Sequence, residues 1–297
     1  MKIFMIILDI KGAIAIAFFM VLNFTIKAQD SFLYAPELFS PTISSGLCGF
    51  SRDGNTIYYV QEDTVLKKMF VYRALRKKNR WINPQILPFS GQYNDVGGRL
   101  TPDGNTFYFT SDRPGGSSLA EDAWNIWTSS LIDGTWSDPI PLLDVNSKGM
   151  ECCPLPISKD VLMFSSDRKK ATSWWIATYT FSSGVETFLD SLNGERFWQW
   201  PSSFANESTL LLNSMGRNDG FGKDDIYVSF LKNGIWSKPV NIGPAVNTAV
   251  YEDGAMLTPD KKYLLFMRHD TPNSPSKVFA VAWLPVLKEI KKKQRHR

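Results

Sequence analysis

One stretch of the sequence, residues 100–142, decides the fold of this chain. It reads Leu100-Thr-Pro-Asp-Gly104, then Thr106-Phe-Tyr-Phe-Thr-Ser-Asp-Arg-Pro-Gly-Gly116, then Asn125-Ile-Trp-Thr128, then Asp133-Gly-Thr-Trp-Ser-Asp-Pro139. The apolar and β-branched residues of these segments favour strands, and the Asp-Gly pairs favour tight hairpin turns. The stretch therefore predicts four short antiparallel strands joined by turns.

The same pattern recurs along the chain at a period near fifty residues. Ile126, Ile176 and Ile226 follow one another at intervals of fifty, and residues 233–239 nearly copy residues 133–139. A fixed period in this range is typical of repeat architectures, and four strands per repeat indicate the blades of a β-propeller.

Five such repeats use nearly all of residues 31–287, and a sixth would need about fifty more residues. The fifth repeat lacks a clear fourth strand, whereas residues 33–38 resemble the fourth-strand region of other repeats, such as residues 239–243. Closed sheets avoid exposed edges. We therefore expect an all-β fold, a five-bladed β-propeller of four-stranded blades whose last blade is closed by the N-terminal segment.

The two ends of the chain differ from the repeats in composition. Residues 1–27 carry a net charge of +2 and residues 288–297 carry +5, which leaves the repeats at −3 within the overall +4. A basic patch that would suggest nucleic acid is therefore not expected on the repeats. We expect residues 288–297 to be a solvated or disordered basic tail.

An apolar run at residues 12–24 follows Lys2 and Lys11, and small or polar residues come after it. The run is shorter than the roughly 20 residues of a membrane span, so it predicts a signal peptide over residues 1–28. Asp9 leaves an uncleaved anchor as the alternative. We expect residues 29–287 to form a propeller exported to the periplasm or cell surface, with no stable membrane span after cleavage, and to be monomeric.

Cysteine and histidine are too few for several kinds of chemistry. The chain has three cysteines, Cys48, Cys152 and Cys153, and two histidines, His269 and His296. An odd number without regular spacing predicts buried thiols rather than a disulfide framework. We expect no metal site and no cofactor, and Ser-His or Cys-His catalysis is disfavoured.

Parts of the repeats resemble the TolB-type, WD-like propeller repeat. The resemblance rests on residues 101–104, 107–116 and 225–229, which match Ser-Pro-Asp-Gly, an apolar strand with Ser-Asp-Arg and glycines, and Asp-Ile-Tyr. It implies an exported propeller, mostly of the non-catalytic kind that binds proteins or cell-envelope polymers. Lys159-Asp160, Asn206-Glu207 and Asp260-Lys261 depart from the Asp-Gly turn. The resemblance therefore implies the blade type more than a shared role.

Four arginines near the ends of second strands are candidate ligand-binding residues: Arg113, Arg168, Arg217 and Arg268. Their guanidinium groups suit carboxylates or sulfates of a polymer. The alternative is that each arginine pairs with an acid of its own loop, such as Asp112, Asp167 or Asp225. A motif repeated in several blades favours this structural alternative.

Acidic and aromatic residues near the predicted channel mouth are the remaining candidates. Asp95, Glu151 and Glu252 precede the inner strands of repeats two, three and five, where paired carboxylates would suit glycoside cleavage. Trp198 and Trp200 share one link and are candidates for stacking on a sugar. Structural roles are the alternative for all five.

The sequence thus favours a non-catalytic binding or scaffold module for a cell-envelope glycan or protein partner. The alternative is a glycoside hydrolase or polysaccharide lyase that uses Asp95, Glu151 and Glu252. We expect any ligand on the face of the longer loops, around the central channel.

Overall fold

The computed structural model describes residues 5–10, 13–18, 30–117, 123–170 and 172–295, and nearly all of the regular secondary structure in them is β-strand. Repeat one forms β4 (Ser45–Phe50), β5 (Thr56–Asp63), β6 (Lys68–Lys77) and β7 (Arg80–Ile86). Repeat two forms β8 (Asp95–Leu100), β9 (Thr106–Ser111), β10 (Asn125–Ile132), β11 (Thr135–Trp136) and β12 (Ile140–Pro141). Repeat three forms β13 (Glu151–Pro156), β14 (Val161–Ser166), β15 (Trp175–Thr180) and β16 (Val185–Phe188). Repeat four forms β17 (Trp198–Asn206), β18 (Thr209–Met215), β19 (Asp224–Lys232), β20 (Ile235–Trp236) and β21 (Val240–Asn241). Repeat five forms β22 (Tyr251–Leu257), β23 (Tyr263–His269) and β24 (Lys277–Ala282).

Each repeat folds into its own antiparallel group of strands, in chain order. The pairing follows β4-β5-β6-β7 in repeat one and β13-β14-β15-β16 in repeat three. Repeats four and five join into one larger sheet, because Asp224 at the start of β19 pairs in parallel with Tyr251 at the start of β22. This single bridge carries Asp224 to the edge of the neighbouring repeat.

The N-terminal segment supplies an edge strand to the fifth repeat. The short strand β3 (Phe32–Leu33) pairs antiparallel with β24, with Leu33 opposite Phe279 and Phe32 opposite Ala280. The N–H of Tyr34 extends this pairing by donating to the carbonyl of Val278. The segment therefore lies beside β24, where the sequence predicted a fourth strand.

The turns between first and second strands are built as the Asp-Gly pattern predicts. In repeat two, Thr101 donates to the Asp103 carboxylate at 2.6 Å, and Gly104 donates its N–H to the Thr101 carbonyl at 2.8 Å. Gly104 has a φ of +79°, which glycine adopts without strain. Lys261 takes the same left-handed conformation in repeat five, with a φ of +56°. These turns are short, so the longer loops gather at the opposite ends of the strands.

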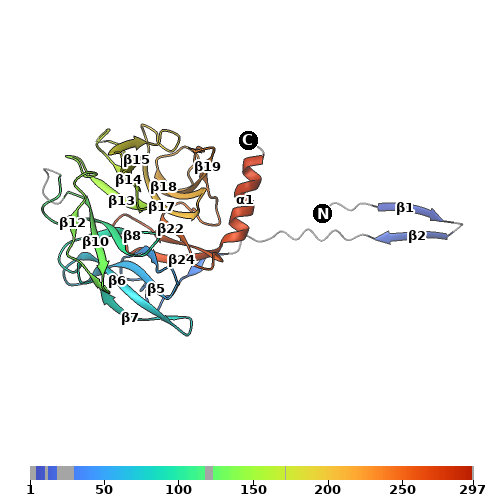
Figure 1. The fold of residues 1–297 in the computed structure, drawn as a ribbon. Coiled ribbons are helices and arrows are strands. Elements are labelled where there is room, and N and C mark those ends of the chain that lie inside the picture. The colour runs from blue at the N-terminus through green and yellow to red at the C-terminus, as the bar shows by residue number, and fades with distance from the viewer. Residues whose placement is uncertain (1–4, 11–12, 19–29, 118–122, 171, 296–297) are drawn as a thin grey trace.

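The first strands of the repeats lie next to one another near the middle of the body (Figure 1). They touch in succession, β4 with β8, β8 with β13, β13 with β17 and β17 with β22, and β22 also contacts β4. The buried apolar clusters lie between consecutive repeats. One of them joins Phe107 of repeat two to Tyr58 of repeat one, and another joins Leu265 of repeat five to Ile57 of repeat one. The described residues thus form several packed, mostly four-stranded sheets, consistent with a propeller.

Residues 283–295 form a helix, so the described part of the tail that was expected to be solvated or disordered is ordered, with its lysines exposed to solvent. Helix α1 (Trp283–Arg295) buries Trp283, Val286 and Ile290 against repeats four and five. Their spacing of three and four residues places them on one helical stripe, which leaves the lysines at 288 and 291–293 on the exposed side. The sequence did not predict this helix because charged residues lie between and after the few apolar residues that form its buried stripe.

The predicted signal peptide, residues 1–28, lies mostly outside the described residues. Within it, β1 (Met5–Ile10) and β2 (Ala13–Phe18) pair antiparallel. No helix in the described part of the chain is long and apolar enough to cross a membrane.

Candidate functional site

Three of the four candidate arginines form buried ion pairs with the three candidate acids. Arg113 reaches Asp95 at 2.7 Å, Arg168 reaches Glu151 at 2.9 Å, and Arg268 reaches Glu252 at 2.7 Å. All three acids are fully buried. The sequence singled out both sets of residues but did not pair them with each other.

The arginines also donate hydrogen bonds to backbone carbonyls of the loop that precedes their own repeat. Arg113 donates to the carbonyl of Phe89, and Arg268 donates to that of Val246 at 2.8 Å. Arg217 makes the equivalent bond to the Leu192 carbonyl at 2.7 Å but has Gln199 where repeats two, three and five have an acid. The arginines therefore connect strands to the preceding loops and stabilise the fold. Their partners are not the loop acids Asp112, Asp167 and Asp225.

This pairing removes Asp95, Glu151 and Glu252 from the surface that a substrate would reach. Burial raises the pKa of Asp95, while Arg113 and the hydroxyl of Ser90 favour its charged form. A carboxylate held by an arginine and surrounded by protein has no access to a glycosidic oxygen. The geometry assigns these acids to the blade framework rather than to acid–base catalysis.

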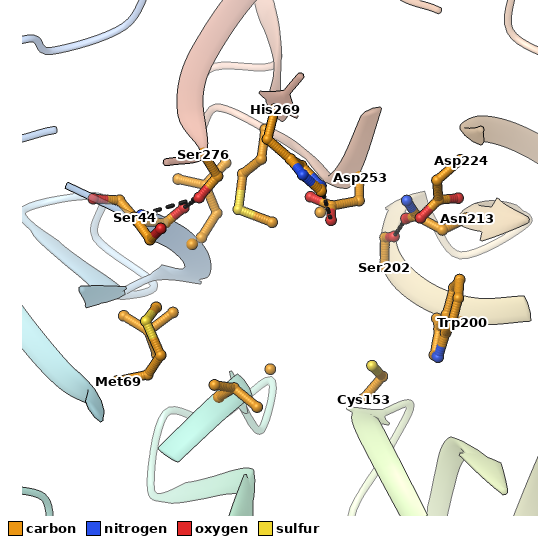
Figure 2. Close-up of a pocket in the computed structure, with 18 of the residues that line it drawn as sticks. Ser44, Met69, Cys153, Trp200, Ser202, Asn213, Asp224, Asp253, His269 and Ser276 are labelled. Carbon is orange, nitrogen blue, oxygen red and sulfur yellow. Dashed lines mark hydrogen bonds and ion pairs between the residues drawn. The ribbon is translucent and has the colours of Figure 1, made fainter. Parts of the chain in front are cut away.

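A cavity of about 390 Å³ opens where the first strands converge. Its wall is contributed by all five repeats and by the loop between β23 and β24, which supplies Ser274 and Ser276 (Figure 2). This loop and the starts of the first strands belong to the face of the longer loops. The cavity therefore lies on the face where the sequence predicted a ligand.

A β-bulge in every first strand shapes the cavity. The register with the second strand shifts after Leu47, Val96, Cys152, Pro201 and Asp253. Gly97 and Gly254 take a φ of +61° at two of these bulges, and Cys153 takes +55° at a third. A bulge re-aims the side chains around it, so residues beside it line the cavity wall.

Cys153 differs from the other two cysteines. All three are free thiols, and Cys48 and Cys152 are buried as expected. Cys153 is half-buried and lines the cavity (Figure 2). A cysteine in a left-handed conformation costs about 1 kcal/mol or more relative to glycine, so this wall carries some backbone strain.

Two carboxylates in the wall, those of Asp224 and Asp253, have unsatisfied oxygens. One oxygen of each side chain is buried without a hydrogen-bond partner among the residues that the structure describes. Burial raises the pKa of Asp224 well above its usual range, and the nearby carboxylates of Asp253 and Asp225 raise it further. Unpaired buried polar groups are rare and costly, which makes this pair the strongest sign of a ligand site.

His269 stands beside Asp253 in the same wall. Its Nε2 lies 3.6 Å from the Asp253 carboxylate, and its Nδ1 lies 2.8 Å from the Thr271 carbonyl. Asp253 raises the pKa of His269, and the Thr271 carbonyl adds to this effect. The ring also stacks on Tyr251 at 4.8 Å, which fixes its orientation.

Trp200 and the amide of Asn213 complete the polar side of the cavity. Figure 2 shows Asp224, Asn213, Ser202 and Trp200 on one side, with Ser44 and Met69 across from them. Asn213 is held in place because its amide donates to the Glu252 carbonyl at 3.0 Å and its oxygen accepts from Ser202. Trp198 lies behind this wall, packed edge-on against Trp200 at 6.4 Å. Of the two predicted sugar-stacking residues, Trp200 therefore lines the cavity.

Arg99 separates this cavity from a second one at the face of the short turns. It lines both, and it donates to the carbonyls of Leu47, Gly98 and Ser202 at 2.8–2.9 Å. Burial lowers the pKa of Arg99, and the neighbouring thiols of Cys48 and Cys153 oppose this change. The guanidinium thus bridges strands across the channel and is not paired with Asp224 or Asp253.

Sequence reasoning missed Asp224, Asp253 and Asn213. Asp224 stands where repeats two and three have Trp124 and Trp174, so a charge at this position departs from the repeat. Among the described residues, no group of three histidines, cysteines or acids is placed to hold a metal ion.

Comparisons with known proteins bear on the fold. No protein-family model matches the chain, and no curated protein matches its sequence. A glycoside hydrolase structure matches with a TM-score of 0.56 at 8% identity, over 85% of this chain and 90% of that one. A thermostable family-43 glycoside hydrolase matches with a TM-score of 0.53 at 11% identity, over 81% and 90%. The fold is propeller-like.

TolB from Acinetobacter baumannii matches with a TM-score of 0.51 at 15% identity, over 81% of this chain. This chain spans about half of that protein, since the match covers 54% of it. The three similar structures include both hydrolases and TolB, so the likeness concerns the fold and the function has to be argued from the site.

Proposed function

We propose that this chain is an exported, five-bladed β-propeller that binds a cell-envelope glycan in the cavity of its long-loop face without cleaving it. The observation that supports this best is the composition of the cavity wall. Trp200 offers an aromatic face, and Ser202, Asn213, Asp224 and Asp253 offer polar groups within about 390 Å³. Sugars are recognised by this combination of an aromatic surface and convergent hydrogen-bonding groups.

The proposed ring of five blades is supported by the contacts between first strands. Each first strand touches the next, and β22 touches β4, so the succession returns to its start. The strand β3 adds the missing fourth strand to repeat five. In this arrangement the cavity is the mouth of the central channel.

Binding is proposed over catalysis because the acids expected for catalysis are held in ion pairs. Glu151, for example, accepts hydrogen bonds from Ser147 and Ser166 in addition to its pairing with Arg168. The carboxylate oxygens that accept these hydrogen bonds cannot at the same time bind a substrate or a catalytic water.

The test is isothermal titration of the whole chain with a panel of short envelope and plant oligosaccharides. We expect at least one to bind, and we expect Trp200→Ala to weaken binding at least tenfold, about 1.4 kcal/mol. Trp81→Ala is the matched control, because Trp81 lies outside the cavity lining and packs against Phe50 rather than Trp200. Equal losses in both variants, or no binding at all, would contradict the proposal.

A second candidate function is glycoside hydrolysis at the same cavity, with Asp224 as general acid and Asp253 as its partner carboxylate. The observation that favours it is the raised pKa of Asp224, since a general acid must keep its proton near neutral pH. Sugar release measured in the same titrations decides between the two. Release that disappears in Asp224→Asn but persists in Asp190→Asn, a surface control, would establish the enzyme and overturn the binding proposal.

A further inference from the structure

The carboxylates of Asp224 and Asp253 share one wall of the cavity without a full cationic partner. Among the described residues, neither forms an ion pair with a lysine or arginine, and Asp253 has only His269 at 3.6 Å, which is a cation only when protonated. Asp224 is 5% exposed, so water does little to offset its charge. Both side chains line the same cavity and the charge of Asp253 acts on Asp224, so a positive group in the cavity would offset both charges.

Arg99 does not supply that charge, although it lines the same cavity. Its Nε donates to the Ser202 carbonyl and its Nη1 to the carbonyls of Leu47 and Gly98, and the ionisable groups that act on it are Cys48 and Cys153 rather than the two acids. The missing cation is therefore expected from a ligand.

The chemistry of the wall favours an ammonium group over a metal ion. A calcium ion takes six to eight oxygen ligands, and the described residues contain no group of three acids, histidines or cysteines placed to hold a metal. An ammonium group needs acceptors for three N–H donors and gains from an aromatic face. Asp224 and Asp253 supply carboxylate acceptors, and Trp200 supplies the face.

We propose that the cavity recognises the free amine of an amino sugar, with Asp224 and Asp253 as the acceptors of its ammonium group. This rests on the proposed function, and it names the class of glycan that the cavity takes. N-acetylation removes the charge and two of the three donors and adds bulk, so an acetylated residue is expected to bind poorly.

The test is isothermal titration of the whole chain with a tetramer of glucosamine and with a tetramer of N-acetylglucosamine. We expect the amine form to bind at least tenfold more tightly, because its charged group donates to the two carboxylates and the acetylated form carries no charge. Asp224→Asn and Asp253→Asn should each lose this preference. Asp190→Asn, whose side chain is 83% exposed and lies outside the cavity lining, should retain it.

Each alternative outcome has a distinct meaning. Equal binding of both tetramers would overturn the ammonium inference while leaving glycan binding intact. Binding of neither tetramer, with binding of a lysine-bearing peptide instead, would overturn the amino-sugar inference and point to a protein partner. A preference lost equally in Asp190→Asn would show non-specific charge attraction and would also overturn it.

Discussion

At the scale of the single residue, Asp224 occupies a position where burial opposes the charged form of its side chain. Its side chain is buried between repeats four and five, and the nearest acids, Asp253 and Asp225, repel its charge. A folded protein without a functional need for such a group would be expected to replace it. Asp224 therefore lowers the stability of the fold while it provides the cavity with an acidic group.

This predicts that Asp224→Asn stabilises the protein, and increasingly so as the pH rises. The folded pKa of Asp224 lies above its unfolded value of about 3.9, so the folded state binds more protons and its stability falls as the pH rises through the folded pKa. The variant avoids this loss, so it should be more stable than the parent at pH 8 while differing little near pH 4. Urea unfolding of both proteins across this range measures the difference. A variant that is less stable than the parent at pH 8 would contradict the account.

The buried arginines give a second prediction, which compares two repeats. Arg113→Ala leaves the fully buried Asp95 without its cation and should cost about 3–5 kcal/mol. Arg217→Ala leaves the neutral Gln199 and removes bonds to the Leu192 carbonyl and Ser214, so it should cost about 1–3 kcal/mol. The free energy of unfolding in urea measures both. If the two losses are equal, the acid is not what makes the Arg113 site costly to break.

The residue scale also shows why the candidate acids were one position away from the cavity. The sequence located Asp95 and Glu252 at the starts of first strands, and the structure has them there. Side chains alternate between the two faces of a strand, so the next residues, Val96 and Asp253, line the cavity. The repeat pattern predicts where a residue lies along a first strand. Which face of the strand its side chain is on depends on the β-bulges, and no local sequence pattern indicated these bulges.

At the scale of the element, strands and turns were predictable because their signals are local. The Asp-Gly turn at Asp103 and the apolar strand after it need no distant contact to be recognised. Helix α1 was missed because its stability comes from packing rather than from an uninterrupted apolar pattern. Few residues of the helix are buried, and most of the residues between and after them are lysines or other polar residues.

The helix gives a prediction that the disordered-tail reading would not make. Ile290 is fully buried against the core of repeats four and five, so Ile290→Ala should destabilise the protein by about 2–4 kcal/mol. Lys291→Ala is the matched control on the exposed side of the helix and should change stability by less than about 0.5 kcal/mol. Thermal unfolding of both variants is the measurement. An unaffected Ile290→Ala would mean that the helix does not hold to the core in solution.

At the scale of the whole molecule, the N-terminal segment connects the last repeat to the first. Leu38 and Phe39 are buried in the cluster that also contains Ile57 and Tyr59 of repeat one and Leu265 and Val278 of repeat five. Phe39 packs edge-on against Tyr59 at 5.3 Å. The repeat period predicted that the N-terminal segment pairs with repeat five, but its buried packing against repeat one required the three-dimensional arrangement.

If the five repeats form a closed ring, damage to this connection should weaken every repeat. Phe39→Ala removes a buried ring at the junction and should lower the free energy of unfolding by about 3–5 kcal/mol. Because each repeat packs on the next, unfolding should remain one cooperative transition. Val65→Ala is the control for loss of an apolar side chain, since Val65 is 85% exposed, and it should have little effect on the free energy of unfolding.

Hydrogen exchange would show which strands lose stability in the Phe39→Ala variant. Increased exchange in β4 and β24, accompanied by increased exchange in the other strands, supports a ring that is closed at this junction. Increased exchange confined to the N-terminal segment, with repeats one and five unchanged, would mean that the ring does not depend on it.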